Sequence, residues 1–120
     1  MNYTLQEKDG QSYIECQPDG GRIENEQDAV DLVGICGEEG TQRLMLHAEN
    51  LTDAFFDLKT GVAGAILLKF AIYQLIVAAV LSPQQGTQGK FHEMVLETNR
   101  GRQFRVFYDR QQAEQWLVSV

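Results

Sequence analysis

The stretch that decides the fold is Val62–Leu81, "VAGAILLKFAIYQLIVAAVL", a run of mostly apolar residues. A run of this length could cross a bilayer. However, Lys69 and Gln74 lie near its middle, and a central lysine costs about 2.5–3.5 kcal/mol on insertion scales. Apolar residues recur at helical spacing in the first half, whereas Leu75–Leu81 is short and β-branched. We therefore expect a helix over Thr60–Tyr73, a buried strand after it, and no membrane span.

Strand and helix signals alternate along the rest of the chain. A hairpin is expected from the strands Tyr3–Glu7 and Ser12–Cys16, which turn at Asp9-Gly10, and Asn25 is a good N-cap for the first helix. Ser82–Lys90, "SPQQGTQGK", is expected to form a flexible loop. The remaining expected elements are that first helix, which runs through Cys36, a strand at Arg43–Ala48, a helix at Phe91–Asn99, a strand at Gln103–Tyr108, and a last helix, capped by Asp109, with Ala113, Trp116 and Leu117 in the core.

The expected order is β-β-α-β-α-β-α-β-α. A leading hairpin followed by repeated α-β units predicts one α/β domain over residues 1–120, with a mixed sheet covered by helices and right-handed crossovers. In open sheets of this kind, functional groups gather where strands end and helices begin.

Charge and cysteine content exclude several classes of function. The net charge is −7, and residues 1–40 carry most of it, with ten acidic and two basic side chains. This balance disfavours nucleic-acid and anionic-membrane binding. Cys16 and Cys36 lie in apolar segments and are expected to be buried, reduced thiols. The first residues lack the features of a signal peptide, so we expect a cytoplasmic protein.

Few residues suggest catalysis. His47 could act as a general base oriented by Glu49 or Asp57, but no marked nucleophile accompanies it, and a structural histidine is the simpler interpretation. "GTQGK" (Gly86–Lys90) lacks the spacing and the hydroxyl of a phosphate-binding loop. Neither histidine has a partner at metal-ligand spacing, and we expect neither a metal nor a cofactor.

Two further features could bind or regulate. Arg100, Arg102 and Arg105 lie close together and could form an anion site. Thr60 is expected to cap its helix, with Gly61 allowing a close approach of the chain. A hydroxyl at a helix start is also well placed for phosphorylation, because the helix dipole favours added negative charge there. Capping alone remains the simpler interpretation.

Three segments resemble a bacterial family, domain of unknown function 4180. They are "HAENLT", "FFDLKTGVAGAILLKFAIY" and "ETNRGRQ", and the resemblance runs from about Asp28 to Leu117. It does not include the N-terminal hairpin and implies no established activity.

More distantly, the element order resembles the STAS-like fold of sulfate-transporter and anti-sigma-factor-antagonist domains. Those domains carry a hydroxyl-Gly pair, phosphorylated by a partner kinase, in an Asp-Ser-Ser-Gly type motif after a central strand. Thr60-Gly61 in "DLKTG" would take that place. Here one extra residue separates Asp57 from Thr60, and Lys59 replaces a small residue.

The sequence therefore predicts a STAS-like module without catalytic activity that binds another protein, and a homodimer is one form this could take. The alternative is a small-molecule or anion-binding protein, or a weak enzyme, with a site formed by His47, Glu49, Asp57 and Arg100. The candidate binding or regulatory residues are His47, Glu49, Asn50, Asp57, Lys59, Thr60, Gly61, Asn99 and Arg100.

Overall fold

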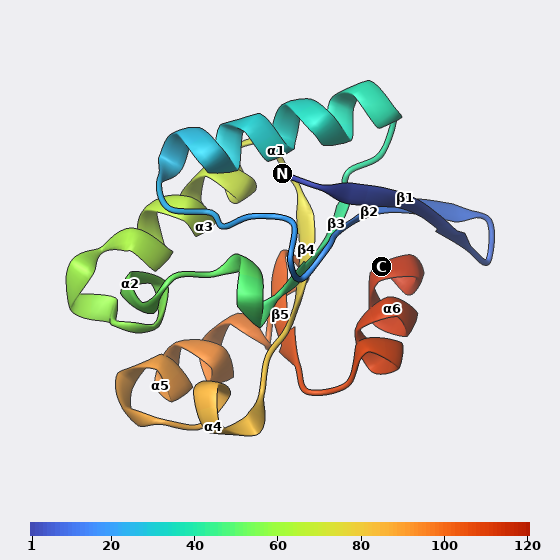
Figure 1. The fold of residues 1–120 in the computed structure, drawn as a ribbon. Helices are drawn as coiled ribbons and strands as arrows, with labels where there is room; N and C mark the ends of the chain where they lie inside the picture. Colours follow the sequence, from blue (N-terminus) through green and yellow to red (C-terminus); the bar gives the residue numbers. More distant parts are fainter.

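The centre of the fold is a five-stranded sheet in which the strands follow their order in the sequence. The computed structural model describes residues 1–120 (Figure 1). The hairpin strands β1 and β2 are antiparallel, and β2, β3, β4 and β5 are mutually parallel, so the sheet is mixed, as predicted. The strands are β1 (Tyr3–Lys8), β2 (Gln11–Cys16), β3 (Arg43–His47), β4 (Ile76–Val80) and β5 (Phe104–Phe107).

Four longer helices cover this sheet. Three of them connect successive parallel strands, and the fourth follows the last strand. They are α1 (Glu26–Glu39), α3 (Val62–Ile72), α5 (Gly89–Thr98) and α6 (Arg110–Ser119). Short helical segments lie between β3 and α3 and between β4 and α5. They are η1 (Ala48–Asn50), α2 (Asp53–Phe56), η2 (Leu58–Thr60) and α4 (Pro83–Gly86).

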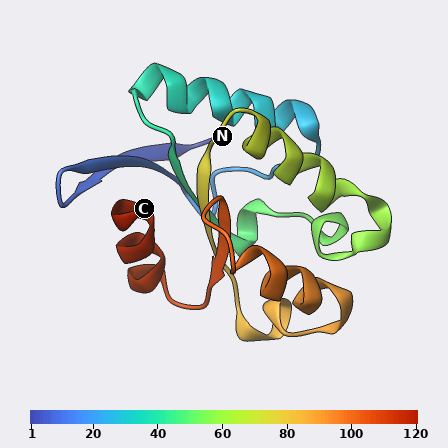
Figure 2. The same ribbon diagram turned by 180° about the vertical axis from the view of Figure 1, so that it is seen from behind.

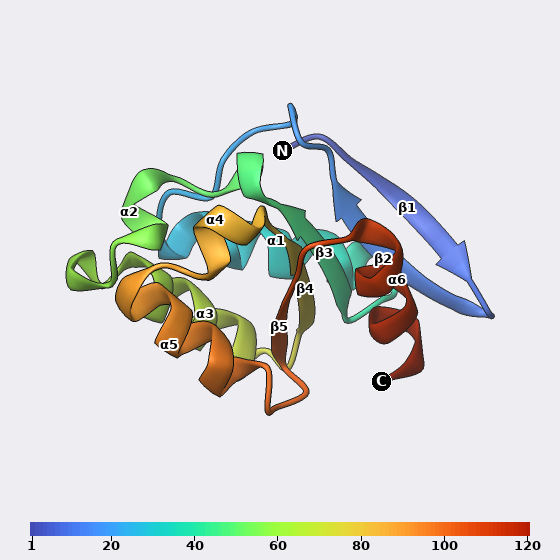
Figure 3. The same cartoon turned by 90° about the horizontal axis from the view of Figure 1, so that it is seen from below.

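The helices divide between the two faces of the sheet. Each crossover adds the next strand beside the previous one, so α1, α3 and α5 all return over one face, where they bury the larger apolar core. Only α6 covers the other face, over Tyr13, Met45 and Ala78. Figures 1 and 2 show α6 on the opposite side of the sheet from α3 and α5, and Figure 3 shows the β1–β2 hairpin extending beyond the rest of the sheet.

The apolar run Val62–Leu81 divides as predicted. Its first half forms α3, which buries Ala63, Ile66 and Phe70, and its second half contains β4. At 1.5 Å per residue the eleven residues of α3 span about 16 Å, roughly half of a bilayer's hydrocarbon core. No helix of the structure combines the length and the apolar character that a membrane span requires.

The prediction of a flexible loop over Ser82–Lys90 is wrong. Ser82 starts α4 with a capping box, in which its hydroxyl accepts a hydrogen bond from the N–H of Gln85 and the Gln85 side chain accepts one from the N–H of Ser82. Pro83 occupies the first helical turn, where its missing N–H costs nothing. These residues are themselves a helix-start signal, and the surrounding glycines and glutamines concealed it.

Both cysteines are free and buried, as predicted. Cys16 lies on β2 and Cys36 near the end of α1, within the larger core. Burial raises the pKa of each thiol to about 12, because a thiolate would lose its hydration there.

Two glycines of contrasting environment provide a test of the packing. A Cβ at Gly20 would lie 2.6 Å from the carbonyl oxygen of Asn2, whereas a Cβ at Gly34, on the exposed side of α1, meets nothing within 4 Å. Gly20→Ala should therefore lower the free energy of unfolding by roughly 1–3 kcal/mol, and Gly34→Ala should raise it by about 0.5–1 kcal/mol. Urea unfolding of both variants measures this, and a stabilised Gly20→Ala would contradict the packing described.

Candidate functional site

The carboxyl ends of β3 and β4 meet at one edge of the sheet, and the segments that leave them enclose a concave surface. We call the main depression the edge hollow. It has a volume of about 600 Å³, and a second hollow of about 400 Å³ shares Phe56, Gln88 and Phe91 with it. The residues that line the edge hollow are Phe56, Asp57, Leu58, Lys59, Gln88, Gly89, Lys90 and Phe91.

Three aromatic rings support this surface. The centroids of Phe55 and Phe91 lie 6.0 Å apart, those of Phe56 and Phe91 5.0 Å apart, and those of Phe55 and Phe56 5.8 Å apart. Phe55 and Phe91 are buried, whereas Phe56 is half-buried. The edge hollow therefore rests on a packed aromatic cluster that joins α2 to α5, and such a cluster gives the surface a fixed shape.

The charged groups of the edge hollow are Lys59, Lys90 and Asp57. Lys59 and Lys90 are exposed and form no ion pair within the chain, whereas Lys8 and Lys69 pair with Glu114 and Glu26 at 3.6 and 3.7 Å. The Asp57 carboxylate accepts a hydrogen bond from the N–H of Lys59 (3.2 Å). The hollow thus carries two free cations in a chain whose net charge is −7.

Thr60 lies directly beside this surface, at the start of α3. Its hydroxyl accepts a hydrogen bond from the N–H of Val62 (3.2 Å) and lies 2.7 Å from the carbonyl oxygen of Ala54, to which it can donate. Gly61 occupies the N-cap position with a positive φ of 77°, which a residue with a Cβ would adopt only with strain. Thr60 therefore does not occupy the N-cap position predicted for it: it ends η2, and its exposed hydroxyl accepts from the N–H of the first residue of α3.

Two of the predicted site residues, Asn50 and Asn99, form hydrogen bonds between their side-chain amides and backbone groups. The buried amide of Asn50 donates to the carbonyl oxygens of Gln17 (2.8 Å) and Gly21 (3.0 Å) and accepts from the N–H of His47 (2.8 Å). Asn99 accepts from the N–H of Val106 (2.8 Å) and donates to its carbonyl oxygen (3.3 Å). Both amides thus hydrogen-bond to backbone groups of the protein through both their oxygen and their nitrogen.

The remaining predicted residues do not converge. Arg100 is exposed on the far end of α5 and pairs with Glu97 at 3.6 Å, and Glu49 is exposed. His47 faces α6, with its Nε2 atom 2.7 Å from the carboxylate of Glu15. Of the four residues of the alternative site, only Asp57 lines the edge hollow. His47, Glu49, Asp57 and Arg100 therefore share no common hollow.

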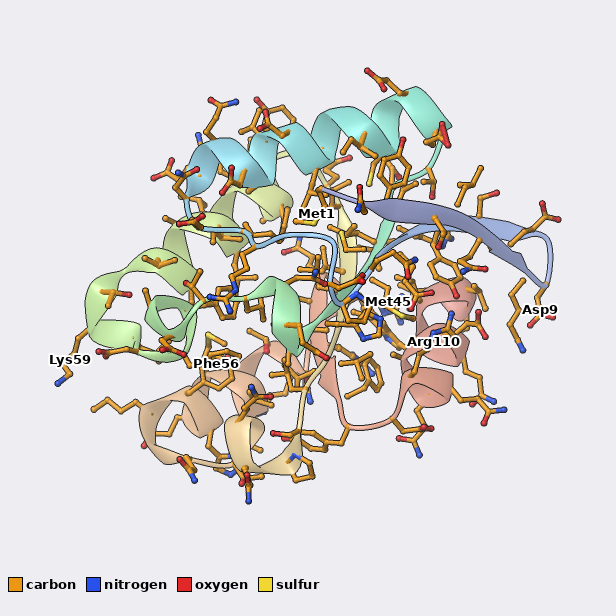
Figure 4. All side chains as sticks on the ribbon, viewed as in Figure 1. Met1, Asp9, Met45, Phe56, Lys59 and Arg110 are labelled. Carbon is orange, nitrogen blue, oxygen red and sulfur yellow. The ribbon has the colours of Figure 1, made fainter.

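The partner of His47 belongs to a polar network that the sequence did not reveal. Glu15 on β2 is only 6 % exposed. Arg110, at the start of α6, donates hydrogen bonds to both carboxylate oxygens of Glu15, with Nη2–Oε1 and Nε–Oε2 distances of 2.7 and 2.9 Å. The Tyr13 hydroxyl donates to Glu114 on α6 and accepts from Arg110. The α6 network comprises Tyr13, Glu15, His47, Arg110 and Glu114. Figure 4 shows Arg110 on the opposite side of the molecule from Lys59 and Phe56.

The electrostatics of this network favour fixed protonation states. Burial alone would raise the pKa of Glu15, but the hydrogen bonds from Arg110 and His47 outweigh it and lower the pKa to about 2. Burial, reinforced by the hydrogen bond to Glu114, raises the pKa of Tyr13 well above its ordinary value. Glu15 therefore stays ionised and Tyr13 stays protonated near neutral pH. The contacts of the α6 network join α6 to the sheet. None of its five residues lines any of the five main hollows, so we assign the network a structural role.

The sequence did not reveal that Glu15 is buried, because "SYIEC" alternates like a strand with one solvent-exposed face. The signal that could have found it is the last helix. A helix after the final strand that covers the second face would bury the polar side of β2, and Arg110 in its first turn is the cation that a buried carboxylate requires.

Glu15→Gln tests the α6 network. The substitution should lower the free energy of unfolding at pH 7 by roughly 2–3 kcal/mol, because it removes the closer of the two carboxylates paired with Arg110 and leaves only Glu114, at 3.9 Å. The folded-state pKa of Glu15 lies below its ordinary value of 4.5, so the stability linked to its charge is present above pH 4.5 and is lost as the pH falls towards about 2. The stability difference between wild type and Glu15→Gln should therefore shrink over that interval in urea titrations. Glu7→Gln, at an exposed position of β1, is the matched control and should show neither effect; a pH-independent difference for Glu15→Gln would refute the assignment.

A comparison with protein families places the chain. The profile of a domain of unknown function, DUF4180, matches residues 8–117, all but the first seven and last three residues. The span includes both the edge hollow and the α6 network, and it begins earlier than the resemblance from Asp28. Comparisons with curated proteins and with solved structures gave no match. The chain therefore belongs to the DUF4180 family.

Proposed function

We propose that this protein is a cytoplasmic, non-enzymatic module that binds another protein through the edge hollow, and that its fold is STAS-like. The observation that carries the proposal is the combination of two unpaired lysines with an aromatic floor at the carboxyl edge of the sheet. Surface lysines are common, but a concave surface that combines Phe56 and Leu58 with two unpaired cations is suited to recognition.

The topology supports the STAS-like assignment. A leading antiparallel strand, sequential parallel strands and a final helix on the second face agree with the element order on which the resemblance was based. The segment between β3 and α3, where the resemblance puts the hydroxyl-Gly pair, is the segment that builds one wall of the edge hollow. Because fold alone does not confer function, the binding proposal rests on the hollow and its charges.

The chemistry of the hollow defines the partner. An apolar side chain of the partner would pack on Phe56, Leu58 and Phe91, and carboxylates beside it would meet Lys59 and Lys90. We therefore propose an acidic protein segment with an exposed apolar or aromatic anchor. Such a segment could belong to a different protein or to a second copy of this acidic chain, and light scattering after size exclusion separates these two cases first.

Charge reversal tests the binding surface. Lys59→Glu combined with Lys90→Glu should reduce partner binding about tenfold or more, because both cations of the hollow become anions. Arg22→Glu combined with Lys69→Glu is the control, since it makes the same change in net charge outside the hollow. Affinity capture with quantitative mass spectrometry, followed by titration of the purified partner, measures the effect. Equal loss of binding in both double variants, or no loss in either, would refute the proposal.

Thr60 is the proposed point of regulation. A negative group there would lie next to Lys59 and at the start of α3, where the helix dipole favours it, and it would oppose an acidic partner. Thr60→Glu should therefore weaken partner binding, whereas Thr60→Ser should leave it unchanged. Thr60→Ala should cost about 1 kcal/mol of stability through the lost hydrogen bonds of its hydroxyl, with little effect on affinity. If all three variants bind the partner as the wild type does, the regulatory role fails while the binding surface stands.

A further inference from the structure

Another hollow, separate from the two at the carboxyl ends of the strands, lies at the opposite edge of the sheet, where β4 and β5 begin. It is bounded by the last turns of α3 and α5 and by the residues that lead into β4 and β5, and its volume is about 300 Å³. We call it the amino-edge hollow. It is lined by Leu67, Phe70, Ala71, Leu75, Glu97, Thr98, Gly101, Arg102, Gln103 and Phe104.

The floor of the amino-edge hollow is the hydrophobic core itself. Phe70, Leu75 and Phe104 are 2, 3 and 6 % exposed and belong to the larger core cluster. Leu67 and Ala71, from the same helix as Phe70, continue the apolar wall towards solvent. A hollow whose apolar floor is built from core residues is held open by the fold, which is the usual condition for binding a small molecule.

The rim supplies one cation. Of the three neighbouring arginines, Arg100 does not line the hollow and pairs with Glu97, and the Arg105 guanidinium lies over the Trp116 ring, 5.3 Å from its centroid, on the α6 face. Only Arg102 lines the hollow, and its side chain forms no ion pair or hydrogen bond within the chain. The Glu97 carboxylate also reaches the rim, where it is already paired with Arg100.

We propose that the amino-edge hollow binds a small organic acid, with an apolar chain or ring on Phe70, Leu75 and Phe104 and a carboxylate paired with Arg102. The apolar floor and the free guanidinium together select this class, because an arginine presents its donors in a fork that fits a carboxylate. A volume of 300 Å³ is about ten times the share of one liquid water, so the hollow takes a ligand of roughly ten heavy atoms. Thr98 and Gln103 at the rim offer further polar contacts.

The test uses two probes with the same phenyl-alkyl body, of which one ends in a carboxylate and the other in a neutral hydroxyl. 4-Phenylbutyrate and 4-phenylbutan-1-ol share one apolar body, and both are titrated into the full chain while backbone amide resonances are followed by NMR. We expect shifts at Thr98, Gly101 and Gln103, with the acid bound about tenfold more tightly than the alcohol, which is the effect of one charge-assisted hydrogen bond.

Matched variants test whether Arg102 binds the carboxylate and whether the apolar floor binds the rest of the probe. Arg102→Gln should abolish the preference for the acid, and Arg100→Gln, two residues away and outside the hollow, should retain it. Ala71→Phe should fill the hollow and remove the binding of both probes. Equal binding of acid and alcohol to the wild type, an unchanged preference in Arg102→Gln, shifts at other residues, or no shifts at millimolar concentrations would each overturn the proposal. Because this hollow shares no residue with the edge hollow, either result leaves the proposed protein-binding function untouched.

Discussion

The interaction on which the arrangement of layers depends is the burial of the Glu15 carboxylate between the sheet and α6. Moving an ionised group out of water costs several kcal/mol of desolvation free energy unless hydrogen-bond donors or an opposite charge compensate it. Arg110 meets both oxygens in a fork, and His47 contacts one of them. At the other end of α6, Arg43 donates to the carbonyl oxygens of Leu117 (3.0 Å) and Val120 (2.8 Å), a favourable place for a cation. Charged groups of the sheet therefore contact both ends of α6, and the buried apolar cluster between them adds the hydrophobic contribution that holds the helix on this face.

This constraint separates structure from recognition. The polar groups on the α6 face are mutually satisfied, so that face has little left to offer a ligand. Sequential strand order also sends all three crossover helices over one face. Helices diverge to opposite faces after the neighbouring strands β4 and β5, where α5 and α6 separate, but none of the five hollows is lined by residues of both helices. The concave surfaces arise instead where loops and helix ends meet at the two edges of the sheet. Those are the places where lysine and arginine side chains remain unpaired.

The sequence predicted the elements well and the side-chain pairing poorly, for a physical reason. Element signals are local: Asn25 caps α1, the Asp9-Gly10 turn closes the hairpin with positive φ at both residues, and Asp109 caps α6. The pair Glu15–Arg110 joins residues that are 95 positions apart, and only the topology brings them together. His47 was expected beside Glu49 or Asp57 because they are near in sequence, yet strand alternation turns its side chain towards α6. Trp116 was expected in the core, but it is half-buried, with its ring against Phe107 and beneath Arg105.

The two buried thiols can report when the core of the protein opens. With a pKa of about 12 and no access to solvent, neither Cys16 nor Cys36 can react with an alkylating reagent while the core is closed. Cys16 on β2 and Cys36 on α1 belong to the same core cluster, so alkylation of either thiol would report the opening of the core between the sheet and α1. The native chain thus carries two thiols that report this opening, and no further cysteine needs to be introduced to follow its unfolding.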